Sequence, residues 1–155
     1  KLIRDMGSTV TAVIEEMRTF AENAALRSDD DLKAIGAALK EAVEGLAEVS
    51  QWIGMNAMGD LRKAFACSVP YLKLWGIVAG GWQMARAAEV SRAKIDAADP
   101  ESDFYRAKIS TARFYADHVL TQSSALRSQI VDGSADVMAM PEAHFDLDRK
   151  TATLV

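Results

Sequence analysis

The chain has 155 residues, of which half are hydrophobic and 26% are charged, and its formal net charge is −4. This length corresponds to one domain, which can bury enough surface to fold without a metal or a disulfide. The scattered Lys and Arg residues argue against nucleic-acid binding, which uses a clustered basic face. One cysteine, Cys67, excludes an internal disulfide and fits a reducing compartment, so we expect a cytoplasmic protein.

Two amphipathic helices are predicted first. Apolar residues recur at positions 3, 6, 10, 13, 17, 20 and 24, which places them on one stripe of a helix that ends near Leu26. The run Ser28-Asp29-Asp30-Asp31 interrupts this pattern and supplies an aspartate N-cap for the next helix. The second stripe occupies positions 32, 35, 39, 42, 46, 49 and 53, and this helix is expected to end at Gly59.

The third predicted helix runs from Asp60 or Leu61 to about Asp96 and contains Pro70. An internal proline removes one backbone hydrogen bond, so we expect a kink or a break near residues 66–69. The stretch 68–88 is apolar on nearly every face, which predicts a helix that is covered all round.

Two glycines and two cations stand out in this apolar stretch. Gly76 and Gly80 are four residues apart, so they share a face that would let another helix approach closely. Lys73 and Arg86 bracket only twelve residues, whereas about 20 are needed to cross a bilayer. We therefore expect a buried helix and no membrane span.

A fourth helix is predicted between the turn Asp99-Pro100-Glu101 and Gly133. Its stripe reads 105, 109, 112, 116, 119, 123, 126 and 130. Four helices with short connections predict an all-α protein, an antiparallel up-down four-helix bundle with a Pro-kinked third helix. Residues 1–133 would form this bundle domain, as a fragment of a longer chain, and residues 134–155 an irregular C-terminal tail.

No motif in the sequence indicates chemistry. Gly-x-Gly-x-x-Gly, a P-loop and Gly-x-Ser-x-Gly are all absent. The only histidines are His118 and His144, and neither follows a Glu by three residues, as a di-iron bundle would require. We therefore assign no catalytic residue and no metal ligand, and we interpret Cys67 as a small buried hydrophobe because its neighbours are apolar.

The aromatic residues have two readings. Trp52, Trp75 and Trp82 would suit stacking on a flat ligand such as a flavin, but such rings more often fill a core or an interface. We favour packing. The residues that we expect to pack or form an interface are Tyr71, Lys73, Trp75, Gly76, Gly80, Trp82 and Arg86.

The segment 66–88 resembles the characteristic helix of the C-terminal domain that is appended to a bacterial subgroup of acyl-CoA dehydrogenases. The shared pattern is Tyr-Leu, a basic residue, an apolar pair, Gly, and then Gly-Trp followed by small residues. The opening Lys-Leu-Ile-Arg-Asp-Met-Gly also resembles the family's Lys-Leu-x-Arg-Asp-Gly-Gly, from which Met6 departs. The resemblance covers roughly residues 1–132.

This resemblance implies a parent enzyme that uses FAD to dehydrogenate an acyl-CoA thioester between its α and β carbons. Its catalytic glutamate belongs to a Tyr-Glu-Gly-Thr motif upstream of the opening segment, and that motif is absent here. The chain is therefore expected to hold no cofactor of its own. Its expected partners are the upstream catalytic domains and further copies in a homo-oligomer, while the acyl-CoA substrate belongs to the parent.

Two alternatives remain open at this point. The chain could be a free-standing helical interaction module, which a start codon at Lys1 would support. A weaker possibility is that the bundle itself binds FAD or acyl-CoA, which titration with each ligand would test.

Overall fold

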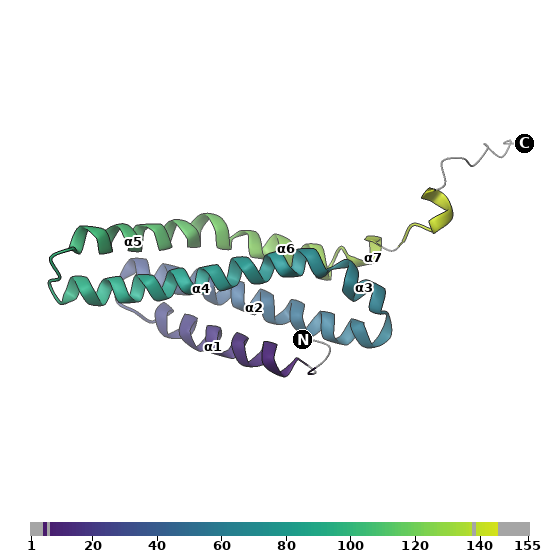
Figure 1. Cartoon of the computed structure of the whole chain (residues 1–155), viewed down its shortest axis with the longest axis horizontal. Coiled ribbons are helices and arrows are strands. Elements are labelled where there is room, and N and C mark those ends of the chain that lie inside the picture. The colour runs from purple at the N-terminus through teal and green to yellow at the C-terminus, as the bar shows by residue number, and fades with distance from the viewer. Residues whose placement is uncertain (1–4, 6, 138, 146–155) are drawn as a thin grey trace, which may run out of the picture.

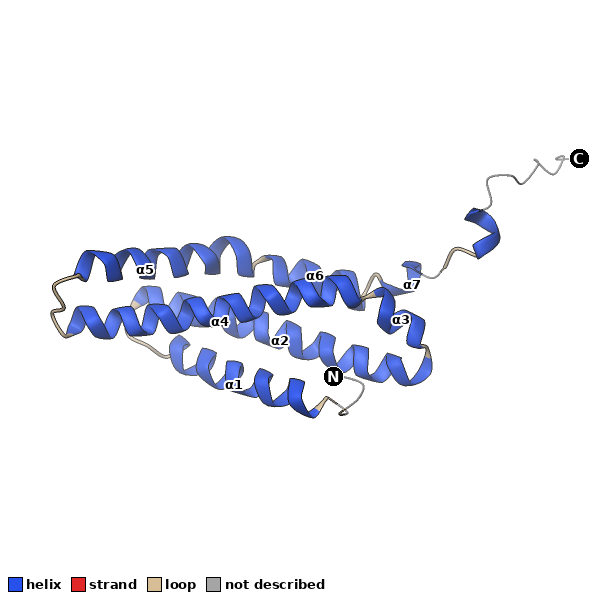
Figure 2. Cartoon of the chain, in the orientation of Figure 1, coloured by secondary structure: helices blue, strands red, loops and turns tan. Residues whose placement is uncertain are grey.

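The computed structural model describes residues 5, 7–137 and 139–145. Every regular element within these residues is a helix, which confirms the predicted all-α class (Figure 2). The elements are α1 Ser8–Ala25, α2 Asp30–Gly59, α3 Leu61–Ala66, α4 Ser68–Asp96, α5 Ser102–Tyr115, the π-helix η1 Ala116–Leu120, α6 Gln122–Val131, α7 Ser134–Val137 and the 3₁₀-helix η2 Glu142–Phe145.

The long helices lie side by side, and α2 is the central one (Figure 1). It packs against α1 and also contacts α4, α5 and α6, while α4 packs along α5. The start of α1, the end of α2, the whole of α3 and the start of α4 lie at the same end of the molecule (Figure 1). None of the described helices is long and apolar enough to cross a membrane.

The predicted buried face and N-cap of α2 are confirmed. All seven positions of its predicted stripe, from Leu32 to Ile53, are buried. The predicted cap is Asp29, whose carboxylate accepts a hydrogen bond of 2.9 Å from the backbone N–H of Leu32. Since α2 has neighbouring helices on more than one side, it also buries Val43, on the flank of the stripe.

The stripe predicted for α1 is confirmed in part, since Met17 and Ala24 are buried as predicted. Ile14 and Ala21 are buried, whereas Val13 and Phe20 are only half-buried. Neighbouring residues of an α-helix point about 100° apart, and α1 carries apolar residues in adjacent rows. Packing against α2 decides which of these rows faces the core. The predicted positions Ile3 and Met6 lie outside the described residues.

The third predicted helix is divided at Cys67, within the range where a kink or a break was expected. Pro70 is the third residue of α4, where a backbone N–H would have no partner inside the helix, so a proline costs little there. The expectation that this helix is covered all round is wrong. Val69, Leu72 and Val90 are exposed, so the helices that α4 contacts leave one of its faces uncovered.

The fourth predicted helix is interrupted by the π-helix η1 between α5 and α6. A π-turn contains more residues than an α-turn, so it changes which positions face the core. Leu120 is buried, and Val119, which belonged to the predicted stripe, is only half-buried. The stripe resumes at Ser123, Leu126 and Ile130.

The segment predicted as an irregular tail contains two short helices within its described part. These are α7, in which Ser134 is buried, and η2. Position 138 and residues 146–155 of the predicted tail lie outside the described residues.

Candidate functional site

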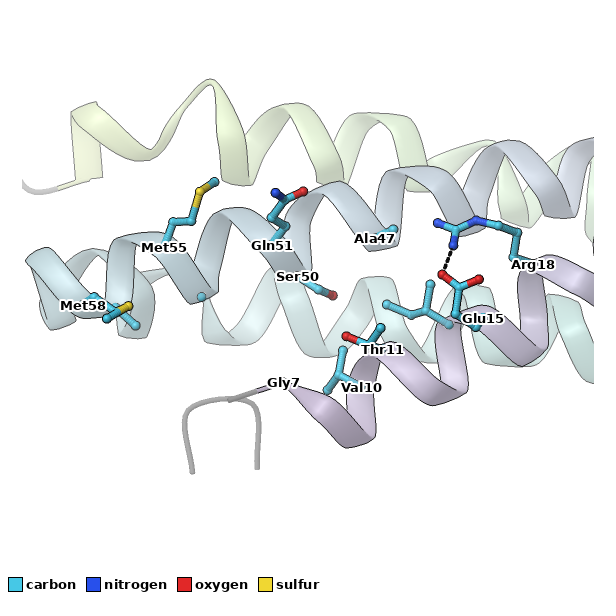
Figure 3. Close-up of a pocket in the computed structure, with 13 residues that line it drawn as sticks. Gly7, Val10, Thr11, Glu15, Arg18, Ala47, Ser50, Gln51, Met55 and Met58 are labelled. Atoms are coloured by element: carbon cyan, nitrogen blue, oxygen red, sulfur yellow. Dashed lines mark hydrogen bonds and ion pairs between the residues drawn. The ribbon is translucent and has the colours of Figure 1, made fainter. Parts of the chain in front are cut away.

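A groove lies between the first half of α1 and the last half of α2 (Figure 3). Its volume is about 650 Å³. Most of the lining is apolar or small, with a few polar side chains from both helices. The lining residues are Gly7, Val10, Thr11, Ile14, Glu15, Arg18, Ala47, Ser50, Gln51, Gly54, Met55, Ala57 and Met58.

The charge at the edge of this groove is already neutralised. The guanidinium of Arg18 donates from Nε to Glu44 at 2.7 Å and also pairs with Glu15 (Figure 3). The hydrogen bond from Arg18 lowers the pKa of Glu44, so this carboxylate stays ionised beside its partner. Among the described residues that line it, the groove therefore offers no free cation to an anionic ligand.

The Ser50 hydroxyl in the groove is also satisfied. It donates to the backbone carbonyl of Leu46 at 2.7 Å and accepts, at 2.8 Å, from the hydroxyl of Tyr71 on α4. Because buried polar groups need such partners, this pair ties α4 to α2 and leaves an apolar groove wall. A ligand for the groove would be held mainly by apolar contact.

Beside the groove, large apolar side chains are exposed where α2, α3 and α4 meet. We call this set the apolar end. Met58 is 91% exposed, Val69 77% and Leu72 74%. The members of the apolar end are Met55, Met58, Leu61, Phe65, Val69 and Leu72. Since Met55 and Met58 also line the groove, the groove and the apolar end are continuous.

The two glycines predicted to admit a close helix behave differently. A Cβ at Gly80 would touch the hydroxyl of Tyr115 on α5 and come within 3.1 Å of its Cζ, whereas a Cβ at Gly76 would meet nothing within 4 Å. The Tyr115 hydroxyl donates to the Ile77 carbonyl at 3.1 Å, and burial raises the pKa of this phenol. Gly80 is thus a contact with α5, while Gly76 is exposed.

The predicted aromatic residues pack against the core from α4 and α2. Tyr71 and Trp75 are half-buried and meet edge to face, with ring centroids 6.4 Å apart. Trp82 is also half-buried, and the guanidinium of Arg86 lies over its ring at 5.3 Å. Trp52 packs against the same core from α2.

The predicted cations at the two ends of the apolar stretch face outward. Lys73 and Arg86 are both exposed. Arg86 donates to the side chain of Gln83 at 3.3 Å. No carboxylate within the described ranges lies at ion-pair distance from Lys73 or Arg86, so neither cation joins α4 to another described helix.

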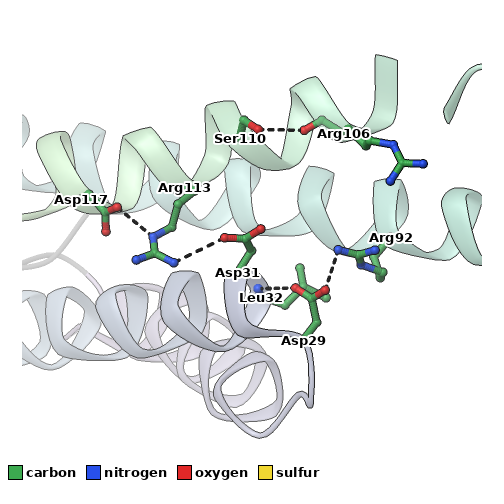
Figure 4. Close-up of polar contacts among 8 residues, drawn as sticks. All are labelled: Asp29, Asp31, Leu32, Arg92, Arg106, Ser110, Arg113 and Asp117. Carbon is green, nitrogen blue, oxygen red and sulfur yellow. Dashed lines mark hydrogen bonds and ion pairs between the residues drawn. The ribbon is translucent and has the colours of Figure 1, made fainter. Parts of the chain in front are cut away.

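A polar cluster fastens the opposite end of the molecule (Figure 4). Asp29, the N-cap of α2, pairs with Arg92 of α4 at 2.5 Å. Arg113 of α5 lies between Asp31 at 3.4 Å and Asp117 at 2.8 Å. A second cavity of about 420 Å³ lies beside Asp29 and Arg92. The pairs Asp29–Arg92 and Asp31–Arg113 hold the start of α2 against α4 and α5.

The residues considered for chemistry are scattered. Cys67 is buried, and burial raises the pKa of its thiol, as expected for a small packing residue. His118 is exposed with its ring against Phe114, and His144 is exposed in η2. No three side chains of the types that ligate metals gather within the described residues.

The sequence analysis did not predict two close-packing positions, Gly36 and Gly81. A Cβ at Gly36 would lie 2.6 Å from the backbone carbonyl carbon of Ala24, so this glycine lets α1 cross close to α2. A Cβ at Gly81 would lie 2.6 Å from a methyl group of Leu120, which the π-helix directs at α4. No local signal distinguishes these glycines from the others, because each obstacle comes from a different helix.

Comparison with known proteins gives two findings. Residues 13–141 match the family model described as "Acetyl-CoA dehydrogenase C-terminal like". The chain is also similar to the 3-methylmercaptopropionyl-CoA dehydrogenase of Ruegeria pomeroyi, with 34% identity over 139 residues. That match covers 85% of this chain but only 22% of the relative. Since the family model spans most of the chain, the chain belongs to the acetyl-CoA dehydrogenase C-terminal-like family.

Proposed function

We propose that this chain is the non-catalytic C-terminal domain of an FAD-dependent acyl-CoA dehydrogenase and that it serves domain packing or subunit assembly. The observation that best supports this role is the continuous apolar surface formed by the groove and the apolar end. Soluble monomers rarely expose large apolar patches, and such patches mark interaction sites. The parent reaction would be the α,β-dehydrogenation of an acyl-CoA thioester, carried out in the rest of the polypeptide.

The two cavities do not fit a flavin dinucleotide. Its pyrophosphate needs free cations or free backbone N–H donors. Arg18 at the groove is held by two carboxylates. The second cavity is lined by three acids, Asp29, Glu89 and Asp96, and the two arginines that line it pair with Asp29 and Glu89. We therefore place FAD in the parent enzyme and assign it no residue of this chain.

The finer description of the domain is also part of this proposal. We infer one up-and-down four-helix bundle over residues 1–133, in which α3 with α4, and α5 with α6, each act as one helix, followed by a tail over residues 134–155. Packing of α2 against α1, α4, α5 and α6 supports this arrangement. We further propose a cytoplasmic location, on the single cysteine of the chain.

The test is truncation of the parent enzyme. One variant would stop just before Gly7, and a control would stop just after Gly133 and so remove only the tail. We expect the first variant to keep bound flavin and to reduce it in a single turnover with an acyl-CoA, while its thermal stability or its oligomer mass falls. The control should keep all these properties.

The decisive measurements are the flavin absorbance spectrum, stopped-flow flavin reduction and light scattering. If the shorter variant stays folded and assembled but no longer reduces its flavin, the domain contributes to the chemistry and the proposal is wrong. If it keeps its full stability and its oligomer mass, the domain serves neither packing nor assembly.

A further inference from the structure

We propose that the groove and the apolar end together form a docking face for the part of the same polypeptide that precedes this domain. The inference rests on the proposed function and deepens it, because it names the surface and its occupant. Of the three kinds of occupant that an apolar face can have, the structure favours the tethered preceding domain over a second copy or a free ligand.

The first argument is where the chain enters the molecule. Gly7 lines the groove and has a left-handed φ of 81°, so the backbone turns there, directly before α1. The Asp5 carboxylate fixes this turn by accepting from the N–H of Gly7 at 3.1 Å and from the hydroxyl of Thr9 at 2.6 Å. The described backbone therefore enters α1 at a residue that lines the groove.

The second argument is how much polypeptide such a parent contains. The chain matches only 22% of the Ruegeria relative, so more than three quarters of that protein lies outside the match. A neighbour tethered through a short connection has an effective concentration in the millimolar range, far above that of a free partner. The face nearest the connection is therefore the one that a preceding domain covers first.

The third argument is the chemistry of the face. The Arg18 charge at its edge is paired with Glu15 and Glu44, and the Ser50 hydroxyl has both of its partners. An anionic ligand such as a CoA phosphate would find no free cation among the described residues that line the groove, whereas an apolar protein surface needs none. The exposed methionines Met55 and Met58 are flexible and adapt well to such a surface.

A photo-cross-linking experiment in the full-length parent enzyme tests this proposal. Met58 is replaced by p-benzoylphenylalanine, and the matched control carries the same replacement at Leu26, which is 84% exposed at the other end of α1. After irradiation, a denaturing gel gives the mass of the product and peptide mass spectrometry identifies the partner segment. We expect Met58, and not Leu26, to cross-link within one chain to a peptide that precedes Asp5.

Two outcomes would overturn the proposal. A product of twice the chain mass would make a second copy the occupant. A cross-linking yield at Met58 no higher than that at Leu26 would show an open face. In either case the truncation result would still decide the assembly role by itself, so failure of this inference can be told apart from failure of the proposed function.

A charge substitution gives an independent readout. Met58→Glu alters a side chain that is 91% exposed in this domain, so the domain should still fold. Burying a carboxylate at the docked face should weaken docking at least tenfold, which is about 1.4 kcal/mol. We expect hydrogen exchange in α3 to rise about tenfold with the oligomer mass unchanged. Leu26→Glu should leave that exchange unaltered, and an equal effect of both variants would contradict the proposal.

Discussion

Replacing Gly36 with alanine should destabilise the chain, although alanine is the better helix former. A Cβ at this position of α2 would lie 2.6 Å from the carbonyl carbon of Ala24 and 2.9 Å from its Cβ, and closer still to the backbone nitrogen of Ala25. These atoms belong mainly to the backbone of α1, so α1 itself would have to move. Overpacking costs about 1–3 kcal/mol and the gain in helix propensity is about 1 kcal/mol. Because the obstacle is rigid backbone, we expect the upper end of the overpacking cost, about 3 kcal/mol, and hence a net loss of about 2 kcal/mol.

The matched control is Gly45→Ala on the same helix. There the nearest atom to a new Cβ is the Cβ of Arg127 at 4.0 Å, an ordinary contact. This variant should gain up to about 1 kcal/mol from propensity alone. Urea denaturation measures the change in the free energy of unfolding of both variants. In a thermal melt, each kcal/mol should shift the Tm of a domain of this size by roughly 2–4 °C. If both variants are stabilised alike, α1 does not cross α2 closely at Gly36 and the reasoning fails.

Three further predictions concern single positions. Gly80→Leu should overpack the contact with a tyrosine of α5 and lower the stability by about 1–3 kcal/mol. Gly76→Leu should cause no such loss, because a Cβ at Gly76 has nothing within 4 Å. Equal melting curves for the two variants would contradict this. In the folded state a hydrogen bond from an arginine lowers the pKa of Glu44. The ionised carboxylate therefore contributes its full stabilisation above the unfolded pKa of about 4.3. This stabilisation is lost as the pH falls through the folded pKa. The stability gap between wild type and Glu44→Gln in urea should therefore shrink below about pH 4. Burial raises the pKa of the Cys67 thiol, so it should react with a disulfide reagent about 100-fold more slowly in the native chain than in urea, and comparable rates would show an accessible thiol.

The candidate site was only partly predictable. The motif residues Tyr71, Trp75 and Trp82 point to family membership and pack against the core, as their size suggests. The groove was not predicted, because it combines residues of α1 and α2 that are distant in sequence. The apolar end lies within residues 55–72, but its exposure depends on which neighbours the fold leaves absent there. The one hint was the excess of apolar residues in the stretch 68–88, which a single bundle does not need on every face.

The sequence by itself determined the helical class, the inward face of α2 and the cap at Asp29. Each of these follows from spacing and residue type within a few turns of one helix, where the physics is local. Only the tertiary structure decided that Gly36 and Gly81 meet a neighbouring helix while Gly76 does not, and that one side of α4 stays exposed. Whether a position has room for a side chain, and whether an apolar face is covered, depends on atoms of other helices that the fold brings alongside.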